Sequence, residues 1–161
     1  VPFRAAIEAD VAAIMTAHVH VPALDEAVPA TLSRRIVTGL LREELHYDGL
    51  VFTDDMEMQA IAGRYGPGEA AVAAVEAGCD GLLICGTDHD RQAAALEAIV
   101  RAVEQDLLPA ARVEAAVARH QRAKARFVAG EPPRPLDARA LREVVGRLEH
   151  EAVATEMRRF A

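Results

Sequence analysis

Three short apolar segments, each followed by a pattern typical of a helix, constrain the fold of this chain more than any other feature. The segments span residues 11–19, 50–53 and 81–85. Apolar runs that alternate with helical patterns are typical of βα units, in which helices cover a buried parallel sheet. The sequence therefore predicts an α/β fold with parallel strands and covering helices.

The expected helices are marked by their start and stop signals. Helical patterns run from about 33 to 45, from 56 to 62, from Pro67 to near Gly78, and from about 110 to 128. Proline at the first helical position and glycine just beyond the last are common helix boundaries. Thr87 or Asp88 can cap a further helix, whose apolar face is expected to contain Leu96, Ile99, Val100 and Val103.

The number of strands is too small for a complete α/β sheet. Three parallel strands would leave an unpaired edge on each flank and an uncovered apolar face. A closed (β/α)8 barrel needs about 250 residues. We therefore expect this chain to be a piece of a larger barrel or to pair with the rest of one. A small three-stranded α/β domain is the alternative.

The end of the chain has a different character. Residues 131–136 include Pro132, Pro133 and Pro135, which favours a linker. Residues 137–161 are predicted to form a helical extension capped by Asp137. Its apolar stripe would consist of Leu141, Val144, Val145 and Leu148.

Composition argues against several classes of protein. No apolar run approaches the roughly 20 residues that a bilayer span needs, so no membrane partner is expected. The first four residues lack the pattern of a signal peptide, which favours a cytoplasmic location. Residues 1–109 hold 18 acidic and 7 basic side chains, so this part would repel phosphates and no nucleic-acid partner is expected. Cys79 and Cys85 are interpreted as reduced core thiols.

The second apolar segment stops abruptly at two carboxylates, Asp54 and Asp55. Acids at the end of a buried parallel strand lie at the C-terminal edge of the sheet, where α/β proteins hold their active sites. Asp54 is therefore the leading candidate for chemistry, unless it only caps the short helix that begins near Met56. Asp55 is expected to cap or orient a loop. Neighbouring side chains at a strand end tend to point in opposite directions, so a metal ion shared by the pair is not expected.

An ordered series of strings resembles glycoside hydrolase family 3, and within it the bacterial β-N-acetylglucosaminidases. The resemblance covers roughly residues 1–130. The strings are Ile14-Met15-Thr16-Ala17-His18-Val19, Pro22-Ala23-Leu24-Asp25, Pro29-Ala30-Thr31-Leu32-Ser33, Leu40-Leu41-Arg42-Glu43-Glu44-Leu45, Gly49-Leu50-Val51-Phe52-Thr53-Asp54-Asp55-Met56-Glu57-Met58 and Ala77-Gly78-Cys79-Asp80-Gly81-Leu82-Leu83-Ile84-Cys85.

The resemblance implies that residues 1–130 form the last three βα units of a (β/α)8 TIM-type barrel, whose missing N-terminal part would be a partner of this chain. The resembled enzyme would be a retaining glycoside hydrolase that needs no cofactor. It would remove terminal β-linked N-acetylglucosamine from peptidoglycan fragments or chitooligosaccharides through a covalent glycosyl-aspartate intermediate. In that family the first aspartate after the seventh barrel strand is the nucleophile, which points to Asp54. Met58 would line the sugar site or pack under its loop. His18 would contact the sugar or serve as a hydrogen-bonded structural residue.

The resemblance also implies that an essential group lies elsewhere. In the resembled enzymes the general acid/base is a histidine paired with an aspartate on an upstream loop, and no matching string occurs in this chain. Since general acid assistance contributes about 10²- to 10⁴-fold in rate, this chain alone is expected to be nearly inactive. Two alternatives are a β-glucosidase, β-xylosidase or glycoside phosphorylase of the same family, and a truncated, non-catalytic barrel remnant that acts as a binding or assembly module.

Overall fold

The computed structural model describes residues 2–128, 130 and 137–160. Contacts between residues divide the chain into two units, Val1–Ala129 and Gly130–Ala161. The predicted linker, residues 131–136, lies outside the described residues. No helix in the described part of the chain is long and apolar enough to cross a bilayer.

The first unit is built on a parallel sheet of three strands. These are β1 (Ala13–Met15), β2 (Leu50–Asp55) and β3 (Gly81–Leu83), with β2 in the centre and both pairs parallel. The α/β fold with parallel strands is therefore confirmed. The strand boundaries differ from the prediction: β1 and β3 are shorter, and β2 extends through both carboxylates, Asp54 and Asp55.

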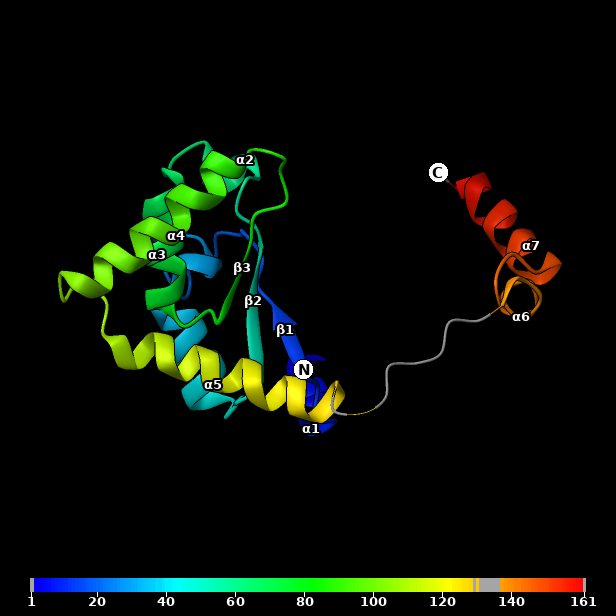
Figure 1. Ribbon diagram of the computed structural model, residues 1–161, viewed down its shortest axis with the longest axis horizontal. Coiled ribbons are helices and arrows are strands. Elements are labelled where there is room, and N and C mark those ends of the chain that lie inside the picture. The colour runs from blue at the N-terminus through cyan, green and yellow to red at the C-terminus, as the bar shows by residue number, and fades with distance from the viewer. Residues whose placement is uncertain (1, 129, 131–136, 161) are drawn as a thin grey trace. The chain divides into compact units, whose positions relative to one another are not determined.

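Helices follow each strand in the predicted order. In the first unit they are α1 (Pro2–Glu8), η1 (Ala30–Leu32), η2 (Arg35–Glu44), α2 (Gln59–Ala62), α3 (Pro67–Ala77), α4 (His89–Glu104) and α5 (Ala110–Phe127). In Figure 1, α3 and α4 lie together on one side of the sheet, α5 crosses its lower end, and α2 lies near its upper end. The sheet therefore has a helical layer on this side.

The predicted helix boundaries hold where local chemistry sets them. Pro67 is the first residue of α3, and the helix stops at Gly78, whose φ of 123° disfavours a side chain. Asp88 caps α4 by accepting a hydrogen bond from Asp90 N at 3.0 Å. By contrast, η2 has the wider winding of a π-helix and ends with Leu45 N donating to Leu40 O.

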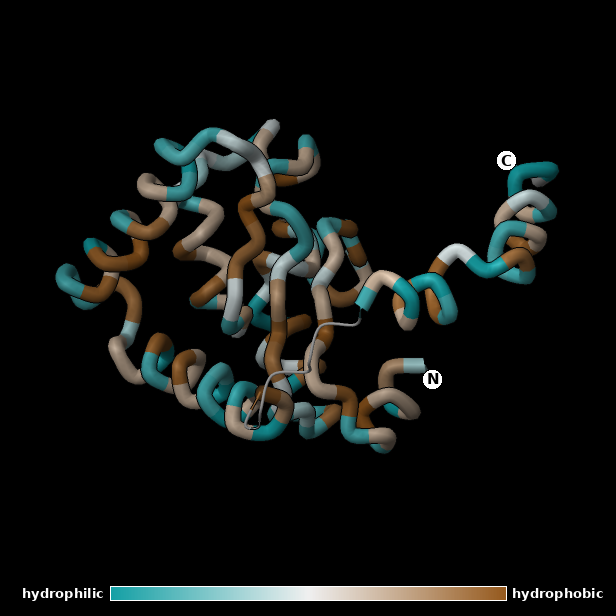
Figure 2. The backbone as a smooth tube through the Cα atoms, turned by 45° about the vertical axis from the view of Figure 1, so that its right-hand side comes forward, coloured by the Kyte–Doolittle hydropathy of each residue, from teal (hydrophilic) through white to brown (hydrophobic). Residues whose placement is uncertain are grey.

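The core lies between the sheet and the helices that follow it. Val51 and Ile61 are fully buried, and Val37, Ala74 and Cys79 belong to the same cluster. Figure 2 shows the hydrophobic stretches of the backbone running through the strands. Burial removes these apolar side chains from water, which is the main force holding β2 against its helices.

Three predictions about individual side chains are wrong. Cys79 is buried, and burial raises the pKa of its thiol to about 12, but Cys85 is exposed and is not a core residue. On α4, Leu96 and Val100 are exposed, and the buried positions are Ala95 and Ala102.

The second unit contains short helices instead of one long one. They are α6 (Ala138–Val144), α7 (Leu148–Met157) and η3 (Arg158–Phe160). Asp137 caps α6 as predicted, accepting from Arg139 N and Ala140 N. The predicted single helix is broken after Val144, where Gly146 adopts a φ of 70°. A left-handed glycine is a common helix stop.

Candidate active site

Asp54 lies at a bulge near the C-terminal end of β2. Phe52 pairs with Gly81 and Asp55 with Leu83, so β2 uses one more residue than β3 between these two pairs. The buried Thr53 hydroxyl accepts a hydrogen bond from Leu83 N at 3.0 Å and so completes the interrupted ladder. Bulges re-aim side chains and are frequent next to active sites. Asp54 therefore sits in the irregular part of the central strand.

The acids around Asp54 differ in how their carboxylates are bound. Asp55 Oδ1 accepts hydrogen bonds from Glu57 N and Cys85 N, both at 3.1 Å. Glu57 forms an ion pair with Arg91, with 3.0 Å between Oε1 and Nε. In the described part of the chain, the only donor to the Asp54 carboxylate is the adjacent Asp55 N, at 2.8 Å on Oδ1. Asp54 is thus the least engaged of these acids.

The capping alternative for Asp54 is wrong. Helix α2 begins at Gln59, its N-cap is Met58, and no side chain bonds to the cap position. The role of orienting a loop belongs to Asp55, as predicted, because its carboxylate binds amides of two different loops.

Hydrogen bonding also sets the protonation of Asp55. The bond from the Glu57 amide is the largest influence and lowers the pKa of this carboxyl below its usual value. A depressed folded-state pKa adds stability that is present above the unfolded pKa of about 3.9 and is lost as the pH falls through the folded value. The Asp55 contacts are therefore fully formed at neutral pH.

His18 joins the ends of β1 and β2. Its Nε2 lies 2.9 Å from the carbonyl oxygen of Asp55, which can only accept, so Nε2 is the donor. Its Nδ1 lies 2.9 Å from the Thr31 hydroxyl, and that hydroxyl lies 2.9 Å from the hydroxyl of Thr16. In the neutral ring Nδ1 therefore accepts from Thr31. Both ring nitrogens are engaged within the protein.

Met58 lies just beyond these acids, at the start of α2. Its backbone N donates to Asp55 O at 3.1 Å, and its side chain is 45% exposed. Met56 is instead the methionine that packs into the core, with 7% exposure. Met58 is therefore at the rim of the strand end and does not pack beneath the loop.

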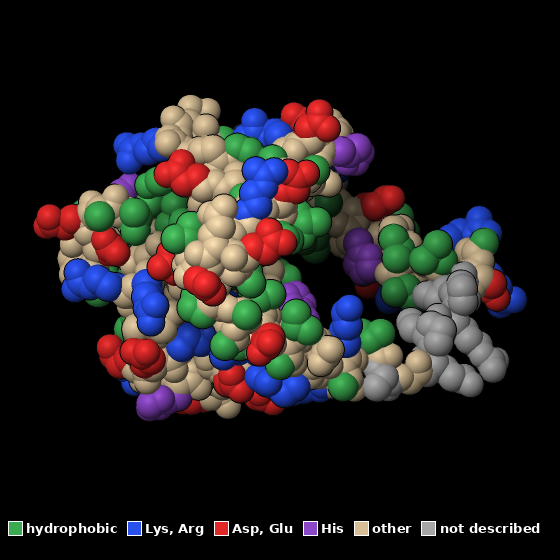
Figure 3. Space-filling model, turned by 60° about the vertical axis from the view of Figure 1, so that its left-hand side comes forward, with side chains coloured by type: hydrophobic (Ala, Val, Ile, Leu, Met, Phe, Trp, Pro, Cys, Tyr) green, Lys and Arg blue, Asp and Glu red, His purple; other side chains and the backbone are tan. Residues whose placement is uncertain are grey.

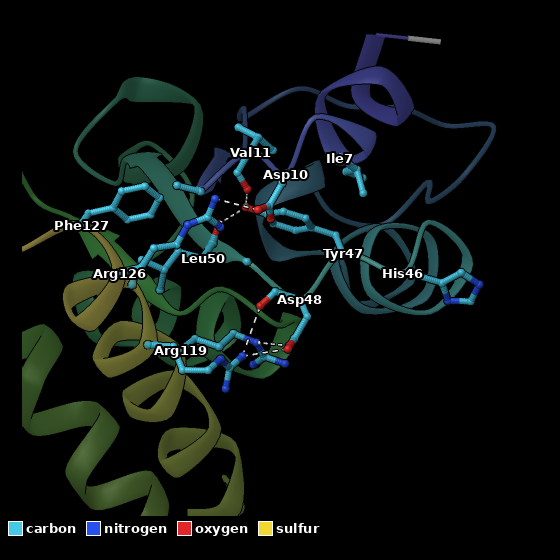
Figure 4. A pocket seen from close by; sticks show the side chains of 14 residues that line it. Ile7, Asp10, Val11, His46, Tyr47, Asp48, Leu50, Arg119, Arg126 and Phe127 are labelled. Carbon is cyan, nitrogen blue, oxygen red and sulfur yellow. Dashed lines mark hydrogen bonds and ion pairs between the residues drawn. The ribbon is translucent and has the colours of Figure 1, made fainter. Parts of the chain in front are cut away.

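A hollow lies at the opposite end of β2 from Asp54. It is a cavity of about 430 Å³ beside Leu50, lined partly by α5 (Figure 4). Charged side chains that line this cavity form ion pairs with one another. Asp48 pairs with Arg119 and Arg122, and Asp10 pairs with Arg126. Sites of α/β sheets lie at the other end of the strands, so this cavity is not a candidate for the chemistry of Asp54.

Sequence reasoning missed the partners that hold the candidate site together. Thr31 binds His18 across 13 residues, and Glu57 binds the amide of Gly86 across 29 residues. No local pattern in the sequence signals such contacts.

Within the described residues, no group of three or more His, Cys, Asp or Glu side chains is arranged to hold a metal ion. Charges of both signs are interspersed over the face drawn in Figure 3.

Comparison with known sequences points to one family. Residues 1–123 match the family model of the glycosyl hydrolase family 3 N terminal domain. A β-hexosaminidase of Thiobacillus denitrificans is 47% identical over 85 residues, which are 53% of this chain and 23% of the relative. One from Vibrio cholerae is 49% identical over 84 residues, or 52% of this chain and 25% of the relative. The chain thus spans about a quarter of these relatives.

Solved structures give the same result. A family 3 β-N-acetylglucosaminidase from Paenibacillus sp. is 47% identical, with a TM-score of 0.79, and the match covers 85% of this chain and 26% of that one. The β-N-acetylglucosaminidase of Thermotoga maritima is 32% identical, with a TM-score of 0.70, over 77% of this chain and 27% of that one. By family model, sequence and fold, the chain belongs to glycosyl hydrolase family 3.

Proposed function

We propose that this chain is the C-terminal part of the barrel of a retaining β-N-acetylglucosaminidase, with Asp54 as its nucleophile. The observation on which the proposal depends is the Asp54 carboxylate, which stands at the bulged end of the central strand without a charged partner among the described residues. The names of the relatives, β-hexosaminidase and β-N-acetylglucosaminidase, support the choice of sugar.

The proposed reaction is a double displacement. The ionised Asp54 attacks C1 of the sugar while the leaving oxygen receives a proton, and a covalent glycosyl-aspartate forms. Water then attacks C1 from the face that the leaving group vacated, and the sugar is released with retained configuration. The substrate class is terminal β-linked N-acetylglucosamine of peptidoglycan fragments or chitooligosaccharides.

The proposal includes a partner that supplies the proton. We infer that residues 1–130 are completed by preceding barrel segments, which provide the acid/base, and that residues 137–161 follow the barrel. The relatives support this, since the chain spans about a quarter of their length. The free edges of β1 and β3 support it as well, because parallel sheets are normally covered and paired.

Two other named residues have proposed places at this site. Met58, with its exposed side chain beside Asp55, would form part of the sugar-binding rim. His18 has both nitrogens engaged and would meet a sugar only through its ring carbons. Its hydrogen bond to the Asp55 carbonyl would fix the strand end next to the nucleophile.

The nucleophile can be tested in the complete enzyme by trapping with a 5-fluoro glycoside and mapping the labelled peptide. We expect the label on Asp54, and we expect Asp54→Ala to lower kcat by about 10⁴-fold or more, as for other catalytic nucleophiles. The matched control is Asp48→Ala, an exposed acid before the same strand, which should keep near-parental turnover. A label on another residue would overturn the assignment.

Assays with and without phosphate separate the remaining candidates. A β-glucoside phosphorylase is also similar in structure, with 27% identity and a TM-score of 0.71. Release of p-nitrophenol from the N-acetylglucosaminide that does not depend on phosphate supports the hydrolase. Phosphate-dependent release would indicate a phosphorylase, and no turnover by the complete protein would favour a binding or assembly module.

A further inference from the structure

The loops after β2 and β3 are fastened to each other by the acids that follow Asp54. Asp55 Oδ1 binds the amide of Cys85 at 3.1 Å, and the Glu57 carboxylate accepts a hydrogen bond from the amide of Gly86. Cys85 and Gly86 lie just after Leu83, the β3 residue that pairs with Asp55. The two carboxylates therefore tie residues 85 and 86 to the end of the central strand.

The contact with Glu57 leaves no room for a side chain on residue 86. A Cβ atom built on it would lie 2.7 Å from Glu57 Cδ and 2.8 Å from Oε1, closer than real side chains approach. The φ of Gly86 is not in the left-handed region, so the need for glycine here is one of space. A side chain at this position would displace the Glu57 carboxylate, which is the end of a flexible side chain, from the amide of residue 86.

Helix α4 holds the same segment from its other side. Arg91 pairs with Glu57, and the Glu57 side chain is only 20% exposed. Gln92 Nε2 donates to the carbonyls of Ile84 and Gly86, both at 3.3 Å. The Arg91 side chain is 37% exposed, so this ion pair lies at the edge of the surface. Residues 84–86 are thus held by side chains from β2, its following loop and α4.

We propose that Glu57 is a positioning residue for the reaction at Asp54. Together with Asp55 it keeps the Cys85–Gly86 segment as a fixed wall beside the nucleophile, so that the sugar is held with C1 in line with the attacking oxygen. Misplacement of reacting groups by about 1 Å reduces rates by about 10²-fold. This inference rests on the proposed function of Asp54.

The test uses the complete enzyme and compares Glu57→Ala, Glu57→Gln and Arg91→Gln. We expect Glu57→Ala to reduce kcat/KM by about 10- to 100-fold, mainly by lowering kcat, while the fluoro-glycoside still labels Asp54. Glu57→Gln keeps an acceptor for the Gly86 amide and should recover most of this loss. The matched control is Glu97→Ala, which removes an exposed ion pair within α4 and should change nothing.

A second comparison tests the contact itself. Gly86→Ala should impair the parent enzyme, and the impairment should shrink when Glu57 is already alanine, because the clash is then absent. Equal effects in the two backgrounds would contradict the contact. If Glu57→Ala does not fold, Arg91→Gln, which removes the ion pair to Glu57, decides the role. A lowered kcat supports positioning, and parental kinetics contradict it.

The outcomes separate the two proposals. Glu57→Ala with parental kcat/KM, in an assay where Asp54→Ala is inactive, would overturn only the positioning role. A lowered melting temperature with unchanged kinetics would do the same, because it indicates a purely structural contact. Turnover by Asp54→Ala would instead overturn the proposed function.

Discussion

His18 binds Thr31 and the carbonyl of Asp55, and so links a chain of hydrogen bonds to the strand that bears Asp54. Replacing it by alanine leaves the buried Thr31 hydroxyl without one partner and frees the carbonyl of Asp55. Unsatisfied buried polar groups cost about 1–3 kcal/mol. We expect His18→Ala to destabilise the complete enzyme by this amount in urea unfolding and to lower kcat/KM. His20→Ala, an exposed neighbour, is the control, and equal unfolding midpoints for the two variants would contradict the argument.

Single residues could be predicted from the sequence where the signal is local. The place of Asp54 and Asp55 near the end of a strand could be predicted, because an apolar run stops at these two acids. The role of Asp54 as nucleophile stays a prediction. Glu57 and Thr31 could not be predicted, because their partners lie 29 and 13 residues away and depend on how the strands align. The exposure of Cys85 was missed for the same reason, since β3 ends two residues earlier than its apolar pattern suggests.

Strands β2 and β3 are joined to η2 and α5 through one buried carboxylate. The Asp80 side chain is fully buried and accepts from Val51 N at 3.0 Å. It also pairs with Arg42 on η2 at 2.5 Å, and with Arg112 and Arg119 on α5 at 3.1 and 3.3 Å. These arginine side chains are only 11–20% exposed, and Asp80 is the buried negative charge that all of them share.

Removing that charge should weaken the packing of these elements. Breaking a buried ion pair costs about 3–5 kcal/mol, because an uncompensated charge stays inside. We expect Asp80→Asn to destabilise the complete enzyme by this amount in urea unfolding. Asp48→Asn is the matched control, since Asp48 also pairs with Arg119 but is 73% exposed, and exposed pairs contribute at most about 1 kcal/mol. Similar losses in both variants would contradict the argument.

The predictions for whole elements succeeded where a cap or a proline decides the boundary. Pro67, Asp88 and Asp137 each begin a helix as expected, because their chemistry acts on the nearest backbone groups. The bulge in β2 depends on pairing with β3, which periodicity does not contain. The break at Gly146 was missed because the apolar stripe continues through it.

The first unit leaves apolar surface open along the outer edge of its sheet. Beside β1 lies an apolar groove of about 220 Å³, and Phe3, Met15 and Val19, which line it, are each more than half exposed. A strand of a parallel sheet is normally buried on both faces. Met15 on β1 is therefore exposed where a further strand or helix would cover it. The three strands predicted from the sequence also led us to expect an uncovered apolar face. The sequence could not identify which side chains would be uncovered.

Completion of the barrel should therefore change both the surface and the activity of this chain. Residues 1–161 alone should bind the dye ANS at the open groove. They should also turn over substrate about 10²- to 10⁴-fold more slowly than the complete enzyme, if upstream segments supply the acid/base as proposed. In the complete enzyme the upstream segments would cover Met15 and Val19, so dye binding should fall. The turnover rate of Asp54→Ala in the complete enzyme gives the background rate of the activity assay. If the isolated chain binds no dye and reaches the activity of the complete enzyme, the groove is not an interface and no upstream acid is needed.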